Sequence, residues 1–219
     1  MTNLTHDKES VIQLILCDEN PQVIEAWKVQ FKKHPAIQIK QSPLLESGAD
    51  ACLCPGNAFG FMDSGLSYSM SQAFGWEIQD KLRQEVRETY DGELLMGQAV
   101  TLPTRITPPW LVYSPTVRAT ASACATVNAY LSMRGALIAV INHNQSAHKQ
   151  NSQKSPIQSL ATSGLCTGEE GMHPHVSARQ IRYAYEQCIG VRSLADKNFS
   201  QLSRRETKMK AIPASGLEE

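Results

Sequence analysis

Apolar residues along this chain occur in short runs that alternate with stretches of helical periodicity. Residues 11–17 (VIQLILC) form an apolar run of the length of one buried strand. In the polar stretch that follows, Asn20 is placed to cap a helix and Pro21 to begin it, and apolar residues then recur on one face: Val23, Ile24, Trp27 and Phe31. The pattern predicts a strand followed by an amphipathic helix.

The middle of the chain continues this alternation. Residues 37–40 and 49–54 are typical of strands, and the second runs directly into a loop with three glycines, CPGNAFGFMDSGLS at 54–67. A helical pattern follows over 67–90, with Gly75 as a candidate break. Its apolar positions are typical of a face turned to the core: Met70, Phe74, Ile78, Leu82 and Val86.

The second half of the chain adds further elements of both kinds. It predicts strands at 93–103 and 110–116, a largely buried helix at 126–143, a polar loop at 143–155 and a strand at 156–162. A second glycine-rich loop, 163–171, leads to a helix that begins at Pro174. Because strands and helices alternate throughout, we expect an α/β fold with a mixed, mostly parallel central sheet in a three-layer α/β/α domain.

Composition and length indicate one domain with loose ends. A chain of 219 residues, 42% of them hydrophobic, can bury one sizeable core. We expect a flexible N-terminus at 1–10, the domain at 11–194 and a flexible charged tail at 195–219, where the periodicity is lost. A partner-binding helix is the alternative for the tail.

Charge limits the classes of partner. The chain carries 21 basic and 21 acidic residues, so no overall positive field exists to gather bulk nucleic acid. No apolar run approaches the roughly 18 residues that a membrane span needs. An anionic ligand must therefore be held by a local site.

The cysteines indicate a reducing, cytoplasmic setting. All six are scattered, none forms a CxxC pair, and no charged and apolar leader precedes them: Cys17, Cys52, Cys54, Cys124, Cys166 and Cys188. Cys52 with Cys54, and His173 with His175, have the i, i+2 spacing that points side chains to opposite faces of a strand. We therefore expect neither a metal site nor a cofactor.

The two glycine-rich loops are the candidate chemistry of the chain. If both follow neighbouring parallel strands, their main-chain N–H groups can converge on a diphosphate, helped by the positive ends of the helices that follow. Neither loop has a Walker A sequence or the GxGxxG order of a dinucleotide fold. The residues alone thus predict an anion-binding cleft.

Four segments resemble the macro domain family, in its bacterial and phage-type branch. They occur in family order within residues 11–192: ADACLCPGNAFGFMDSGLSYSMSQAFGW, GELLMGQAVTLP, LVYSPTVRATASACATVNAYL and SGLCTGEEGMHPHVSARQIRYAY. The resemblance implies a mixed sheet between helices and a cleft that binds ADP-ribose. Many members of the family also hydrolyse ADP-ribose esters or phosphates, and the resemblance implies this activity as a further expectation.

The resemblance also implies roles for residues of the first loop. Asn57 matches the asparagine that contacts the distal ribose, and a carboxamide can donate to and accept from vicinal hydroxyls; a turn residue is its alternative role. Further ligand-binding candidates here are Cys54, Gly56, Phe61, Ser64 and Gly65. In the second loop the match to the family's diphosphate loop covers Ser163, Gly164, Leu165, Cys166, Thr167 and Gly168, with Glu169 and Glu170 expected to point to water.

Two positions depart from the family pattern. Ser67 stands where the hydrolases carry an aspartate, and Asp63 is the candidate to replace it, so the catalytic prediction is Asn57 with Asp63. Helix capping is the alternative for Asp63. Ser42 stands where the family carries the aspartate that binds adenine, and Asp18 is the candidate to take over adenine binding. The alternative role of Asp18 is at the start of the following helix.

Three functions remain open at this point. The first is a module, expected as a monomer, that binds ADP-ribose or an ADP-ribosylated protein or nucleotide. The second is a hydrolase that removes ADP-ribose from targets or dephosphorylates ADP-ribose 1″-phosphate. The third is a macro-like scaffold that acts by protein contacts.

Overall fold

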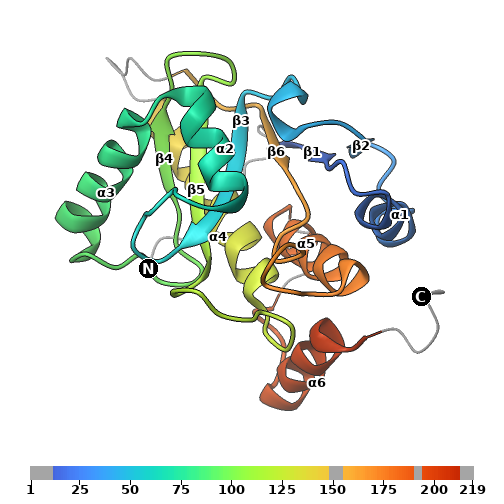
Figure 1. Cartoon of the computed structure of the whole chain (residues 1–219). Coiled ribbons are helices and arrows are strands. Elements are labelled where there is room, and N and C mark those ends of the chain that lie inside the picture. Colours follow the sequence, from blue (N-terminus) through green and yellow to red (C-terminus); the bar gives the residue numbers. More distant parts are fainter. Residues whose placement is uncertain (1–11, 148–154, 190–193, 213–219) are drawn as a thin grey trace.

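One six-stranded sheet forms the centre of the molecule, here a computed structural model that describes residues 12–147, 155–189 and 194–212 (Figure 1). The strand order is β2-β1-β6-β3-β5-β4. All neighbouring strands are parallel except β4 and β5, which are antiparallel. The strands are β1 (Gln13–Cys17), β2 (Gln38–Lys40), β3 (Ala51–Asn57), β4 (Val100–Pro103), β5 (Trp110–Val117) and β6 (Ser159–Thr162). The predicted mixed, mostly parallel sheet is confirmed.

Helices cover both faces of the sheet, which gives the predicted three layers. One face packs against α1 (Pro21–Gln30), α4 (Asn128–Ala147) and α5 (Pro174–Cys188). The other packs against α2 (Gly65–Phe74), α3 (Glu77–Tyr90) and the short 3₁₀ helix η1 (Leu44–Glu46). Alternate residues of β1 serve the two cores, since Leu14 and Leu16 belong to the first and Ile15 and Cys17 to the second.

Local signals set the predicted helix boundaries. The Asn20 side chain accepts a hydrogen bond from the Gln22 N–H at 2.9 Å, and Pro21 is the first residue of α1. Gly75, with φ of +89°, separates α2 from α3, because an L side chain rarely adopts that conformation. Pro174 begins α5 as expected.

Two predicted segments differ from the structure. The strand expected over 93–103 is regular only at β4, and helix α4 extends to Ala147, past the start of the expected polar loop at 143. The polar residues that suggested a loop make tertiary hydrogen bonds instead: the Asn144 carboxamide bonds the Ile157 N–H and carbonyl, both at 2.8 Å. Residues 148–154 of the expected loop lie outside the described residues.

A helix occupies part of the segment expected as a tail. Helix α6 (Phe199–Lys210) begins at a capping box made by Asn198 and Gln201 and lies outside α5, away from the sheet (Figure 1). Arg179 of α5 donates to the carbonyl oxygens of Lys208, at 2.8 Å, and Ala211, at 2.6 Å. Residues 199–210 of the segment expected as a flexible charged tail therefore have regular structure, while the expected flexible N-terminus at 1–10 and the last residues of the tail, 213–219, lie outside the described residues.

Arg179→Ala is expected to loosen α6 selectively. The change removes two hydrogen bonds from a buried guanidinium, worth about 1–3 kcal/mol together. Amide protons of α6 should then exchange faster with solvent, while those of the central sheet keep their protection. Arg204→Ala, on the exposed side of α6, is the matched control. Equal protection of α6 in both variants would contradict the assignment.

Within residues 12–147, 155–189 and 194–212, no helix combines the length and the apolar content that a transmembrane segment requires.

Candidate functional site

A cavity of about 700 Å³ opens where the parallel strands end. Its walls include the last residues of β1, β3 and β5, namely Cys17, Asn57 and Val117, and Ser163 directly after β6. Both glycine-rich loops line it, with Gly56, Asn57, Ser64 and Gly65 from the first and Gly164, Cys166, Thr167 and Gly168 from the second. Crevices at the carboxyl ends of parallel strands are the usual ligand sites of such sheets.

Asn57 organises the first loop. Its Oδ1 accepts from the main-chain N–H groups of Phe59, at 3.0 Å, and Phe61, at 3.2 Å, while its Nδ2 donates to the Phe61 carbonyl at 2.9 Å. The turn role that the sequence left as an alternative is therefore present. One N–H of the carboxamide has no acceptor among the described residues and borders the cavity.

Gly56 permits a close contact beneath the same loop. The Tyr113 hydroxyl donates to the Asn57 carbonyl at 2.7 Å, and burial raises the pKa of Tyr113 well above its ordinary value, so the donor stays protonated. A methyl group at Gly56 would overlap the Tyr113 hydroxyl oxygen and lie 2.7 Å from ring carbon Cζ. The absence of a side chain at Gly56 thus lets the Tyr113 ring support the loop.

The start of α2 presents main-chain donors to the cavity. Ser64 is the N-cap, but no side chain caps the helix, and the Ser67 hydroxyl donates to the Ser64 carbonyl at 2.8 Å. Within the described residues, the N–H groups of Gly65, Leu66 and Ser67 have no acceptor, as expected for a first helical turn. All three residues line the cavity.

Asp18 fixes the second loop from the opposite wall. Its Oδ2 accepts from the Gly164 N–H at 2.9 Å, and its Oδ1 accepts from the Asn20 N–H at 2.8 Å. Thr167 closes the loop by donating its hydroxyl to the Gly164 carbonyl at 2.8 Å. The N–H groups of Cys166 and Gly168 have no acceptor in the part of the chain that the structure describes. Both residues line the same cavity as the first turn of α2.

A third wall, residues 119–122, follows β5. Its side chains are small and exposed, and its end is tied to the second loop because the Ala123 N–H donates to the Glu170 carbonyl at 2.9 Å. The Glu170 side chain lines the cavity, with Oε1 3.2 Å from the hydroxyl oxygen of buried Thr116. Glu170 is thus bonded within the site, although the sequence predicted that it points to water.

Solved structures with a similar fold are macrodomains of bacteria. The Oceanobacillus iheyensis macrodomain with ADP has a TM-score of 0.53 and 10% identity, over 77% of this chain and 84% of that chain. The same macrodomain with MES bound has a TM-score of 0.53 and 11% identity, over 77% and 85%. This chain has the macro domain fold. The macrodomain of Mycobacterium tuberculosis DarG is also similar, with a TM-score of 0.49 and 17% identity, over 67% and 86%.

The chain thus shares this fold with proteins whose sequences differ from its own at most positions. No protein-family model and no curated protein matches the sequence. At such low identity the comparison establishes the fold, and the roles of individual residues depend on their own geometry.

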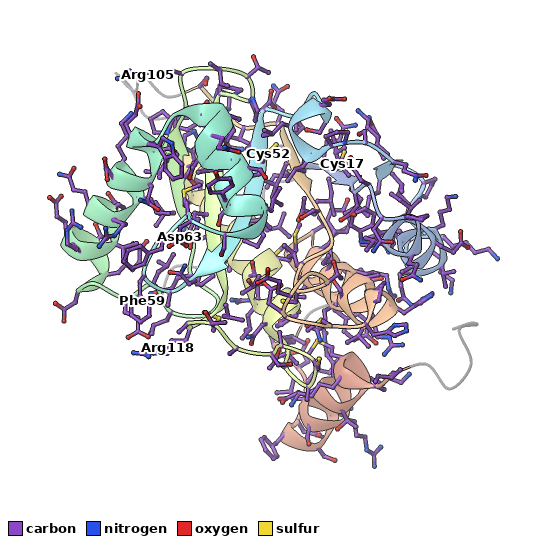
Figure 2. The ribbon with its side chains drawn as sticks, viewed as in Figure 1. Cys17, Cys52, Phe59, Asp63, Arg105 and Arg118 are labelled. Atoms are coloured by element: carbon purple, nitrogen blue, oxygen red, sulfur yellow. The ribbon has the colours of Figure 1, made fainter. Side chains whose placement is uncertain are left out.

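Four of the predicted site residues do not line the cavity. Cys54 and Leu165 are fully buried in the two cores, where burial raises the pKa of the Cys54 thiol and keeps it neutral. The Phe61 ring lies against Arg83 of α3, with the guanidinium carbon 4.1 Å from the ring centre. Asp63 is exposed in the loop before α2 (Figure 2).

The sequence analysis did not predict every wall of the cavity. It proposed no role for the wall at 119–122, for Cys17 or for Leu44, although VRATAS was among the segments that carried the family resemblance. A run of small residues, Ala-Thr-Ala-Ser, one residue after a buried strand was the available signal. Neighbouring Arg118 turns away, paired with Glu93 at 2.7 Å and placed over the Phe59 ring beside the end of β3 (Figure 2).

Within the part of the chain that the structure describes, no three histidine, cysteine or acidic side chains are grouped to hold a metal ion. The absence of a metal site and of a cofactor stays a prediction.

Proposed function

We propose that this macro domain binds ADP-ribose, free or attached to a protein or nucleotide, in the cavity between its two glycine-rich loops. The observation that carries the proposal is the set of main-chain N–H groups without acceptors, those of Gly65, Leu66 and Ser67 on one side and of Cys166 and Gly168 on the other. Main-chain donors at a helix start and in a glycine loop are typical of phosphate sites.

The dimensions of the cavity support a ligand of this length. The lining residues come from the ends of five neighbouring strands, from β2 to β5, which at strand spacing spans roughly 19 Å. A volume of about 700 Å³ is within the range of small-molecule sites. The similar Oceanobacillus iheyensis macrodomain holds ADP, a part of the proposed ligand.

Hydrolysis remains the alternative function, with less support. Ser67 stands in the first turn of α2 with its hydroxyl bonded to the Ser64 carbonyl, and Asp63 does not line the cavity. Asp63 therefore does not lie where it could activate a water beside a bound ligand, and the Ser67 hydroxyl, although Ser67 lines the cavity, donates its proton to a main-chain carbonyl and has no basic partner. Loss of turnover of an ADP-ribosylated protein in Asp63→Ala would restore the hydrolase hypothesis with Asp63 as base.

Titration calorimetry with ADP-ribose tests the proposal. We expect a dissociation constant in the micromolar range, about −8 kcal/mol. Gly164→Val is the matched variant, because a Cβ at Gly164 would already lie 2.8 Å from the Thr167 hydroxyl and 2.9 Å from Val23 Cγ1. It should weaken binding at least tenfold, by about 1.4 kcal/mol. No heat at millimolar ADP-ribose with the unmodified protein would favour the scaffold hypothesis.

The cellular setting belongs to the same proposal. We infer a cytoplasmic location and a monomeric state. All six cysteines are free, and burial raises the pKa of Cys17, Cys52 (to about 12) and Cys188, which suits structural thiols in a reducing compartment.

A further inference from the structure

The charges around the cavity are unusual for a site proposed to hold a diphosphate. Among the described residues that line it, none is lysine, arginine or histidine, while four are acidic: Asp18, Glu19, Glu169 and Glu170. Arg118, which follows the lining residue Val117, is engaged with Glu93 at 2.7 Å. Among the described lining residues, the electrostatic attraction for an anion therefore comes from main-chain dipoles.

These dipoles and carboxylates occupy different parts of the cavity. The N–H groups without acceptors belong to the start of α2 and to the loop after β6, and β6 and β3 lie at the centre of the strand order. Asp18 and Glu19 follow β1 on one side. Glu170 contacts β5 on the other side, through Thr116. A ligand that fits this pattern has its negative charge in the middle and uncharged groups at both ends.

The two ends differ in their surfaces. The end beside β1 includes the apolar Leu44 and Cys17, which suit the face of a base. The end beside β5 is formed by the small exposed residues 119–122 and by Glu170, whose carboxylate can accept hydrogen bonds from hydroxyl groups. This second end is therefore suited to a sugar.

The Glu170 carboxylate is held at that end by its surroundings. Its Oε1 lies 3.2 Å from the Thr116 hydroxyl oxygen, which is itself 3.3 Å from the Gly56 carbonyl beside Asn57. The Glu170 carbonyl also accepts from the Ala123 N–H, which anchors the residue to the third wall. By contrast, the Glu169 side chain is exposed and has no hydrogen-bond partner within the described residues.

We propose that Glu170 is a specificity-determining residue that accepts an uncharged terminal ribose and rejects a terminal phosphate. This inference deepens the proposed function and rests on it. A phosphate monoester carries about −1.5 to −2 charges at neutral pH and would meet the fixed carboxylate. The macro domain thus selects ADP-ribose, or ADP-ribose joined to a target through its ribose, over ADP-ribose 1″-phosphate, which makes the phosphatase form of the hydrolase alternative unfavourable.

Competitive calorimetry with ADP, ADP-ribose and ADP-ribose 1″-phosphate tests this inference. The unmodified protein should bind ADP-ribose at least about tenfold more tightly than its 1″-phosphate, as expected for one repulsive contact at close range. Glu170→Gln keeps the acceptor for Thr116 but removes the charge, and should narrow that ratio to about threefold or less. Raising the salt concentration should lower the ratio of the two dissociation constants, that of ADP-ribose 1″-phosphate over that of ADP-ribose, in the unmodified protein. The same ratio should stay nearly constant in Glu170→Gln.

Two comparisons separate a fixed local contact from a general effect of charge or fold. Glu169→Gln removes the same charge one residue earlier and should change the ratio less than twofold, since solvent screens an exposed group. Glu170→Asp keeps the charge and should keep the rejection of the phosphate. An unchanged ratio in Glu170→Gln, with ADP still bound, overturns this inference alone. Failure of the unmodified protein to bind either ADP or ADP-ribose overturns the proposed function itself.

Discussion

Gly56→Ala is expected to lower the free energy of unfolding by about 3 kcal/mol. The added methyl group would overlap the Tyr113 hydroxyl oxygen and lie 2.7 and 2.8 Å from ring carbons Cζ and Cε2. The Tyr113 ring is fully buried in a close-packed core and cannot move aside, so the end of β3 must shift. The hydrogen bond from the Tyr113 hydroxyl to the Asn57 carbonyl is then lost. Urea unfolding measures the loss, and ADP-ribose binding should weaken with it.

Gly168→Ala provides the matched comparison in the other loop. A Cβ at Gly168 would meet only the Glu170 Oε2 atom, at 3.5 Å, an ordinary contact, and the backbone there is not left-handed. We expect a change in stability within about 0.5 kcal/mol. A Gly56→Ala protein as stable as Gly168→Ala would refute the role given to the contact between Gly56 and Tyr113.

Asp18→Asn is expected to cost about 2 kcal/mol of stability and to release the second loop. An amide has one acceptor oxygen where the carboxylate has two, so either the Gly164 N–H or the Asn20 N–H loses its acceptor and meets another donor. Hydrogen exchange at the Gly164 N–H should become faster, because its acceptor is the side chain of Asp18, which lies 146 positions earlier in the chain.

Glu19→Gln is the control for this change. Glu19 also lines the cavity, but its side chain is exposed and has no hydrogen-bond partner among the described residues. Its effect on stability should stay within about 0.5 kcal/mol. Equal effects of Asp18→Asn and Glu19→Gln would mean that loss of charge, and not loss of the Gly164 hydrogen bond, determines the result.

These two variants act on opposite walls of one cavity. Gly56 shapes the first loop from below, through the Tyr113 ring, and Asp18 holds the second loop from the side. Asp18 uses the Gly164 N–H, but both contacts leave five other main-chain N–H groups of the cavity without an acceptor among the described residues, those of Gly65, Leu66, Ser67, Cys166 and Gly168. These main-chain donors explain why the cavity can be proposed to bind a diphosphate, although no lysine or arginine is among the described residues that line it.

The individual predictions show which sequence features were sufficient to predict a structural feature and which were not. Asn20 with Pro21, Gly75 and Pro174 act on the backbone beside them, so their positions predicted helix boundaries directly. Asn57 was predicted to contact a ribose, yet three hydrogen bonds to Phe59 and Phe61 already use its carboxamide. The predicted base Asp63 and the predicted ring contact of Phe61 depend on side-chain direction, which spacing does not fix.

The sequence by itself determined the succession of strands and helices along the chain from β1 to α5, the three-layer fold and the two loops at the ends of β3 and β6. The physical reason is that hydrophobic periodicity, glycine and proline act on the few residues around them. Only the tertiary structure decided which groups meet: Asp18 with Gly164, Thr116 with Glu170, and Arg179 with helix α6. Such pairs join residues that are far apart in the chain. Their polar groups come within hydrogen-bond distance only after the sheet has formed, so the sequence pattern around each residue does not show its partner.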